Sequence, residues 1–244
     1  MGGASAAAAP ARIVSLNLCT DEYLLVTARR SQIASISRLG ADRQESPLAA
    51  RAAGLATNKG QLTDVIGQRP DLVLTMGGSQ QAAALARRLG VRLVAVPYPG
   101  SPAEVAQQIA QVAALVGNPA AGAAFARQLA ALQQTAPPLR PGLMIGGSGI
   151  APAQDGLTAG WLRLAGVAQQ RGGSISLEQL LVDQPPILIR NVYRPGQVSA
   201  PQAWTRHPAL AGLHGRRVAA DGRAFLCGGA AMPAEIARLR RALA

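Results

Sequence analysis

The residues best suited to chemistry in this chain are two cysteines and two histidines. Cys19 and Cys227 lie far apart in the sequence, and His207 and His214 lie in a connection rich in proline and glycine. No Cys-x-x-Cys pair and no cluster of cysteine and histidine occurs, so the spacing excludes the usual structural zinc sites. Ser148 is not followed by the second glycine of a nucleophile elbow. The sequence therefore predicts no catalytic residues and no resident metal or cofactor, and it favours a protein that is not an enzyme.

Three glycine pairs follow or lie near the ends of expected strands: Gly77-Gly78, Gly146-Gly147 and Gly228-Gly229. In open parallel sheets, ligands gather at the carboxyl ends of the strands, and glycine there lets the backbone come close to a ligand. None of the pairs continues into the Gly-Lys-Ser/Thr of a phosphate loop. The pairs indicate ligand-facing loops, with plain turn formation as the alternative.

Short apolar strands alternate with helices along the chain, which favours an α/β fold with parallel sheets. The stretch 119–134 breaks this alternation, because it is a helix with no strand against either end. Pro119 suits a first helical position, and Pro137 and Pro138 stop the helix. We interpret it as a rod between two lobes, over 12–118, 119–136 and 140–244. The alternative is one large α/β domain in which this helix lies on the surface.

The chain is strongly basic, with a formal net charge of +12. Its arginines are scattered and no aromatic residues are interleaved with them, so we predict no nucleic-acid partner. An anionic ligand or an anionic membrane face fits the charge better. No run of about eighteen apolar residues exists to span a membrane. Residues 1–9 do not form a signal peptide, and they look like the small-residue stub that remains after one is removed.

The order of several motifs resembles the class III periplasmic substrate-binding proteins of ABC importers, the receptors for cobalamin, ferric siderophores and haem. The first strand, Arg12 to Leu16, is followed by Thr20-Asp21 at the start of a helix, as in the family. Pro70 to Leu74 resembles the family's Pro-Asp-Leu-Val-Ile strand, and Pro185 to Ile189 repeats the pattern in the second half. Pro208 to Val218, followed by a terminal helix, resembles the family's end.

This resemblance implies two Rossmann-like α/β lobes with parallel sheets, joined by one long helix, with a ligand cleft between the lobes. It implies a periplasmic monomer that delivers a metal chelate, either cobalamin or a ferric siderophore, to an ABC permease and its ATPase. The alternatives are a haem receptor of the same fold, a free-standing scavenger or sensor, and an enzyme that uses the same cleft. The cobalamin receptor docks its permease through acidic residues near the lobe tips, but residues 76–85 here contain no acid. Other carboxylates are the candidates for docking, namely Glu45, Glu104, Asp183 and Glu235.

The ligands of the family lie against the loops at the carboxyl ends of the strands in both lobes. The many arginines and few aromatic residues favour an anionic metal chelate as the ligand. A cobalamin fits the composition nearly as well. Trp161 is interpreted as a core residue and not as a ligand contact. The candidate ligand-binding residues on these loops are Asn17, Cys19, Thr20, Lys59, Met76, Tyr98, Arg190, Tyr193, Arg194 and Cys227.

The two cysteines leave three possibilities open. Both could face the ligand as free thiols and contact a soft metal. They could form a disulfide, if their Cα atoms come within about 7 Å of each other, and the oxidising compartment implied by the resemblance favours this. They could also be unrelated, with Cys19 buried and Cys227 in a loop. We expected the free, ligand-facing pair.

Overall fold

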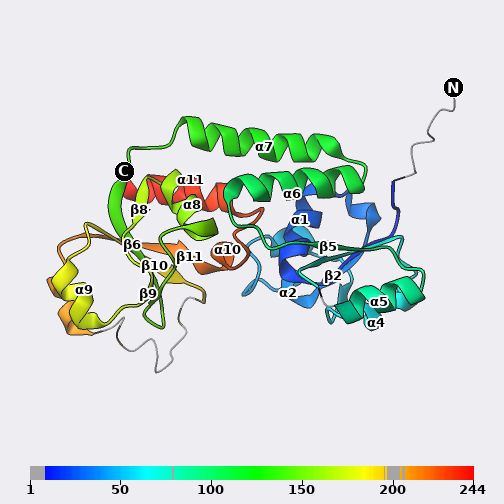
Figure 1. Cartoon of the computed structure of the whole chain (residues 1–244), viewed down its shortest axis with the longest axis horizontal. Helices are drawn as coiled ribbons and strands as arrows, with labels where there is room; N and C mark the ends of the chain where they lie inside the picture. The colour runs from blue at the N-terminus through cyan, green and yellow to red at the C-terminus, as the bar shows by residue number, and fades with distance from the viewer. Residues whose placement is uncertain (1–8, 79, 195, 197–203, 205–206) are drawn as a thin grey trace. The chain divides into compact units, whose positions relative to one another are not determined.

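The computed structural model of this 244-residue chain describes residues 9–78, 80–194, 196, 204 and 207–244. The chain forms two compact units, and each has its own sheet with flanking helices (Figure 1). Unit 1 comprises the described residues up to Tyr98 and Glu104–Arg127, and unit 2 comprises Pro99–Ala103 and the described residues of Gln128–Ala244. The predicted two-lobe α/β architecture is therefore confirmed.

Unit 1 contains a five-stranded sheet in the order β3-β2-β1-β4-β5, in which every pairing is parallel. The central strands are short apolar runs that are buried along their length, as expected for a parallel sheet covered on both faces. Their side chains share a core with the helices that follow them, in which Val14, Val65 and Val73 are fully buried. The strands are β1 Ile13–Ser15, β2 Ile33–Ser37, β3 Thr57–Asn58, β4 Leu72–Met76 and β5 Leu93–Val96.

Helices lie between the successive strands of unit 1, because a parallel sheet needs a crossover connection from the end of one strand to the start of the next. The last helix of the unit follows β5. The helix after β1 starts at a side-chain cap, because Asn17 Oδ1 accepts a hydrogen bond from the Thr20 N–H at 3.1 Å. The helices are α1 Leu18–Thr27, α2 Arg38–Ala41, α3 Ala49–Ala52, α4 Leu62–Val65, α5 Gln80–Arg88 and α6 Pro102–Leu115, with short 3₁₀ turns η1 Arg30–Gln32 and η2 Ile66–Gln68.

The next helix, α7, spans Pro119–Gln134 with the bounds that the sequence predicts. It lies beside α6 (Figure 1), and Gly122 allows this close packing because a Cβ there would lie 2.7 Å from Ala110 Cα. The helix belongs to unit 1 as far as Arg127 and to unit 2 from Gln128 onwards. It is thus the long helix that joins the two lobes. No helix among the described residues is long and apolar enough to cross a membrane.

Unit 2 contains a four-stranded parallel sheet in the order β11-β10-β6-β8 and a separate antiparallel pair of short strands, β7 and β9. The described elements are β6 Arg140–Gly146, β7 Ile150–Ala151, α8 Gly156–Leu164, β8 Val167–Gln169, β9 Gly173–Ser174, α9 Leu177–Asp183, β10 Ile187–Val192, η4 Pro208–Gly212, β11 Arg216–Asp221, α10 Gly222–Cys227 and α11 Met232–Leu243.

Both tryptophans of the chain belong to unit 2 and both hold its loops. Trp161 on α8 is fully buried, as predicted, and its indole N–H donates to the Gly228 carbonyl at 2.8 Å. Trp204 is half-buried against a core that includes Leu143 and Leu188, and its indole N–H donates to the Gly147 carbonyl at 2.8 Å. Two of the predicted glycine loops are therefore tied down by indole hydrogen bonds.

One helix was not expected from the sequence. We predicted that Cys227 lies in a loop between the last strand and the closing helix, but it is the last residue of α10. The helix forms because Asp221 caps its first turn and Gly228 adopts the left-handed conformation that ends it.

Candidate functional site

At the carboxyl edge of the unit 1 sheet, Asn17 connects β1 to β4. Its side-chain N–H groups donate to Thr75 Oγ1 at 3.1 Å and to the Met76 carbonyl at 3.3 Å, while its Oδ1 caps α1. Met76 itself is only 6% exposed. Asn17 and Met76, two of the predicted ligand-binding residues, therefore form the inner part of this edge. Asn17 is half-buried, and both the nitrogen and the oxygen of its side-chain amide make hydrogen bonds.

The most exposed feature of this edge is the ring of Tyr98, which follows β5. Its side chain is 74% exposed, the largest exposure of any aromatic residue described. The ring lies against Gly77, where a Cβ would be 2.8 Å from the ring Cε2. Gly77 has φ of +65°, a conformation that favours glycine. The first glycine pair therefore makes room for an aromatic ring, which is left with one face open to a ligand.

Lys59 lies at the same edge, on the loop after β3. The residue before it, Asn58, is buried, and its amide donates to the Ser15 carbonyl at 2.9 Å and to Ser35 Oγ at 3.0 Å. These bonds connect β3 to its neighbour β2 and to β1 beyond it. Lys59 is exposed on a rigid support and presents its ammonium to solvent.

Behind this edge lies a buried polar network centred on Asp21. The Asp21 carboxylate accepts hydrogen bonds from the Ser37 N–H at 3.0 Å and pairs with Ser37 Oγ. Thr20 is also fully buried, and its hydroxyl lies 2.7 Å from Ser15 Oγ. Burial raises the pKa of Asp21 to about 7, although the hydrogen bonds from Ser15, Ser37 and Gly40 act in the opposite direction. Thr20 therefore connects α1 to β1, and Asp21 connects α1 to β2, both behind the surface that a ligand would reach.

In unit 2, the carboxyl edge of the sheet carries the arginines and the tyrosine that the sequence singles out. β10 ends at Val192, so Arg190 is exposed within the strand, two residues before its end. Tyr193 and Arg194 follow the strand, and the Arg194 guanidinium carbon lies 5.8 Å from the centre of the Tyr193 ring. This distance fits a cation–π contact, which orients both groups at the edge.

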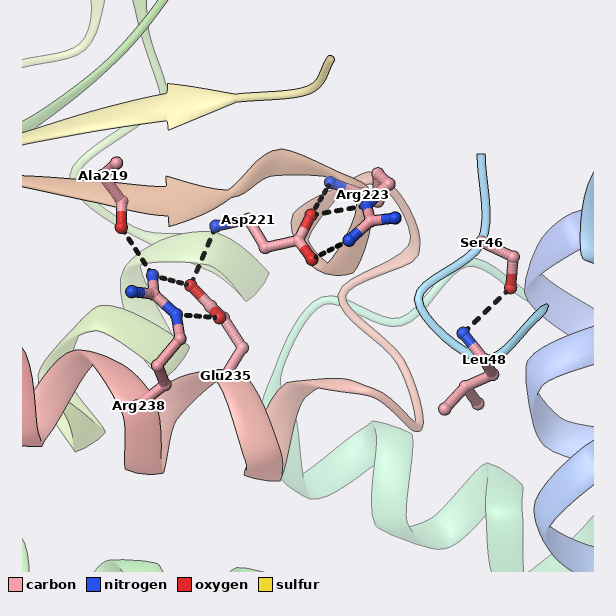
Figure 2. Close-up of polar contacts among 7 residues, drawn as sticks. All are labelled: Ser46, Leu48, Ala219, Asp221, Arg223, Glu235 and Arg238. Carbon is pink, nitrogen blue, oxygen red and sulfur yellow. Dashed lines mark hydrogen bonds and ion pairs between the residues drawn. The ribbon is translucent and has the colours of Figure 1, made fainter. Parts of the chain in front are cut away.

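A neighbouring set of ion pairs was missed by sequence reasoning (Figure 2). The Asp221 carboxylate accepts hydrogen bonds from Arg223 Nε at 2.9 Å and Nη2 at 2.6 Å, and from the Arg223 N–H at 3.1 Å. The Asp221 N–H donates to Glu235 Oε1 at 2.9 Å, and Glu235 pairs with Arg238 at 2.7 Å. Arg238 in turn donates to the Ala219 carbonyl at 2.5 Å. The set thus connects the ends of β11 and α11.

The neighbouring charges in this cluster favour the ionised form of Asp221. Partial burial alone would raise the pKa of Asp221, but the hydrogen bonds and charge of Arg223 outweigh it, so the pKa lies below its ordinary value. Glu235 is only 6% exposed. It was a candidate for docking a permease, and its burial and its pairing with Arg238 argue against that role. The only sequence signal for the cluster is the i, i+3 spacing of Glu235 and Arg238.

Figure 2 also shows the turn before α3 in unit 1, where Ser46 Oγ accepts a hydrogen bond from the Leu48 N–H at 3.1 Å. Ser46 is 2% exposed and Glu45 is 8% exposed. Glu45 is therefore a second predicted docking carboxylate that is buried. Asp183 is paired with Arg171 at 3.2 Å, and Glu104 is exposed on α6, the helix after β5.

Neither Cys19 nor Cys227 is a free thiol, because each is disulfide-bonded. The expectation of two free thiols is therefore wrong. In general, two thiols that come close together in an oxidising compartment form a disulfide. Cys227 is 5% exposed. Among the described residues, no group of three or more histidine, cysteine, aspartate or glutamate side chains is placed to hold a metal ion.

Comparison with solved structures shows that several periplasmic binding proteins have a similar fold. The periplasmic heme binding protein HutB of Vibrio cholerae superposes with a TM-score of 0.73 at 20% identity, over 95% of this chain and 98% of that one. The periplasmic vitamin B12 binding protein BtuF of Vibrio cholerae gives 0.67 at 18% identity, over 96% of each chain. A possible iron-binding protein of Staphylococcus epidermidis gives 0.70 at 17% identity, over 97% of this chain and 99% of that one. No protein-family model matches the sequence, and no characterised protein matches it by sequence.

Proposed function

We propose that this chain, which has the fold of the class III substrate-binding proteins of ABC importers, is a periplasmic receptor that binds a metal chelate and delivers it to a permease and its ATPase. The fold supports a binding protein, since the similar structures carry the names of haem, vitamin B12 and iron-binding proteins. The observation that carries the proposal is the open ring of Tyr98 over Gly77, at the sheet edge where ligands of open α/β folds gather.

Each unit offers candidate ligand contacts near the carboxyl edge of its own sheet. In unit 1, Tyr98 supplies a flat apolar face and Lys59 supplies a positive charge. In unit 2, Arg190, Tyr193 and Arg194 supply further charge and an aromatic ring. Guanidinium groups bind carboxylates with two parallel hydrogen bonds. The set favours a chelate that combines an extended organic surface with peripheral negative charge.

A thermal-shift screen with cobalamin, haem and ferric siderophores tests the proposal. A ligand present at about 100 times its dissociation constant adds roughly 2.7 kcal/mol to the unfolding free energy. For a chain of this size, that corresponds to a rise of roughly 5–10 °C in melting temperature. We expect one of the three ligand classes to give such a rise. If none of them shifts the melting temperature, the chelate assignment is wrong.

Replacing Tyr98 by alanine should weaken binding of the chelate found in that screen by roughly tenfold to a hundredfold. The estimate follows from about 1–3 kcal/mol for burying a large aromatic side chain against a ligand. The melting temperature of the ligand-free protein should hardly change, because the ring is 74% exposed. Isothermal titration calorimetry measures the affinity. Val182→Ala is the matched control, because Val182 is 81% exposed on α9, away from the strand ends. Equal affinity of Tyr98→Ala and Val182→Ala would remove Tyr98 from the site.

A further inference from the structure

The amino edge of the unit 1 sheet, opposite to the proposed ligand edge, is a surface of arginines. The register of the strands sets Ile13 beside Leu72 and Val73 beside Leu93, so the starts of β1, β4 and β5 lie next to one another. Exposed arginines stand at or just before these starts and at the ends of the helices that lead into the sheet. We define this arginine face by Arg12, Arg29, Arg30, Arg51, Arg69, Arg87, Arg88 and Arg92.

The charge of this face is one-sided. Asp71 is the acidic residue at the amino edge, and its carboxylate accepts hydrogen bonds from the N–H groups of Ala11 and Arg12, both at 2.9 Å. The other acidic residues of unit 1 do not lie at the starts of β1, β4 and β5, and three of them, Asp21, Glu22 and Glu45, are buried, while the remaining ones are Asp42, Asp64 and Glu104. The arginine face therefore carries a clear excess of positive charge.

Part of this charge has a structural role. Arg12 donates to the Gln68 carbonyl, and Arg30 donates to the carbonyls of Arg51 and Ala53, so these two guanidinium groups serve the ends of helices. Among the described residues, Arg69, Arg87, Arg88 and Arg92 make no ion pair and no side-chain hydrogen bond, although all four are exposed. These four cations are left to interact with something outside the chain.

Two further features distinguish the face from an ordinary solvated surface. Leu89 is 44% exposed and lies between Arg88 and Arg92 in the chain, so an apolar side chain projects among the cations. Arg69 has φ of +48°, in the left-handed region that favours glycine or asparagine. A cation is thus present where the backbone would prefer a different residue.

We propose that the arginine face binds the surface of an anionic membrane. Anionic headgroups attract each nearby arginine by about 1 kcal/mol, and an exposed leucine among basic residues can enter the boundary between headgroups and acyl chains. A membrane fits better than nucleic acid, because the face offers no aromatic residue on which bases could stack. Binding through the amino edge leaves the opposite edge of the sheet free for a ligand.

Co-sedimentation with lipid vesicles tests this inference with the full chain at low ionic strength. We expect binding to vesicles of phosphatidylcholine mixed with phosphatidylglycerol, a loss of binding at high salt, and no binding to pure phosphatidylcholine. Arg87→Gln/Arg88→Gln should weaken binding by about 25-fold, at roughly fivefold for each arginine. Arg38→Gln/Arg127→Gln is the matched control, since it removes the same charge from exposed positions of unit 1 outside the face.

The variant Arg69→Gly distinguishes an effect of charge on vesicle binding from an effect on the stability of the fold. It should weaken vesicle binding by about fivefold while the melting temperature stays the same or rises, because glycine fits the left-handed conformation. Three results would overturn the proposal: equal binding to neutral and anionic vesicles, equal losses in the double variant and its control, or displacement from vesicles by duplex DNA at equal phosphate concentration. The last result would assign the face to nucleic acid.

Discussion

Reducing the disulfide of this protein should lower its unfolding free energy by up to about 5 kcal/mol. Cys19 and Cys227 are the two cysteines of the chain and each is disulfide-bonded. We predict that the bond joins them within one molecule. It then closes a loop of about 200 residues, for which the chain-entropy model gives about 5 kcal/mol as an upper value. For a chain of this size, that corresponds to a fall of roughly 10–20 °C in melting temperature, which calorimetry with and without a reductant measures.

The matched control is the double variant Cys19→Ala/Cys227→Ala. It should melt close to the temperature of the reduced protein and should not respond to the reductant. Thiol titration of the denatured, unreduced protein should find no free thiol. Two titratable thiols, or a melting temperature that the reductant does not change, would show that the disulfide is absent or does not constrain the chain.

The stability of the protein should fall as the pH rises from about 4 to 7, by up to about 4 kcal/mol, because of Asp21. Burial raises its pKa from 3.8 to about 7, and each pKa unit corresponds to about 1.36 kcal/mol. Between these values, the folded state holds a proton on Asp21 that the unfolded chain has lost. Stability is therefore greatest below the unfolded pKa and decreases as the pH rises through the folded one.

Urea unfolding at a series of pH values measures this slope. Asp21→Asn removes the titrating group and keeps an oxygen for the Ser37 N–H, so the slope between pH 4 and 7 should disappear. Asp155→Asn serves as control, because Asp155 is exposed and makes no capping bond at the start of α8. Asp221, whose pKa lies below its ordinary value, acts in the opposite direction and only at more acidic pH. A slope that survives in Asp21→Asn would refute the assignment.

The parts of the fold that follow from local chemistry were predictable from the sequence. The apolar runs that become β1 and β4 are buried on both faces, and Pro119 starts α7 as expected. Elements that depend on distant contacts were not predictable. The two-residue strands β7 and β9 exist because they pair with each other, and α10 depends on an Asp221 cap that is itself oriented by Glu235.

The candidate site shows the same limit. The sequence places polar residues after strands, but it does not say which of them are used inside the protein. Thr20 and Met76 turn out to be buried, whereas Tyr98 is open because Gly77 leaves space beneath its ring. The state of the two cysteines also depended on the tertiary structure, since residues about 200 positions apart give no local signal. The arginine face emerges only when the strand register brings separate residues to one edge.

The central claim is that this protein binds a metal chelate and releases it unchanged. Native mass spectrometry of the protein mixed with cobalamin, haem or a ferric siderophore tests it most directly, because the mass of the complex reports stoichiometry and the mass of the recovered ligand reports chemistry. The account predicts one complex with one chelate per chain, and a ligand of unaltered mass after denaturation. Failure to form a complex with any of the three ligand classes, or recovery of a chemically altered ligand, would contradict it.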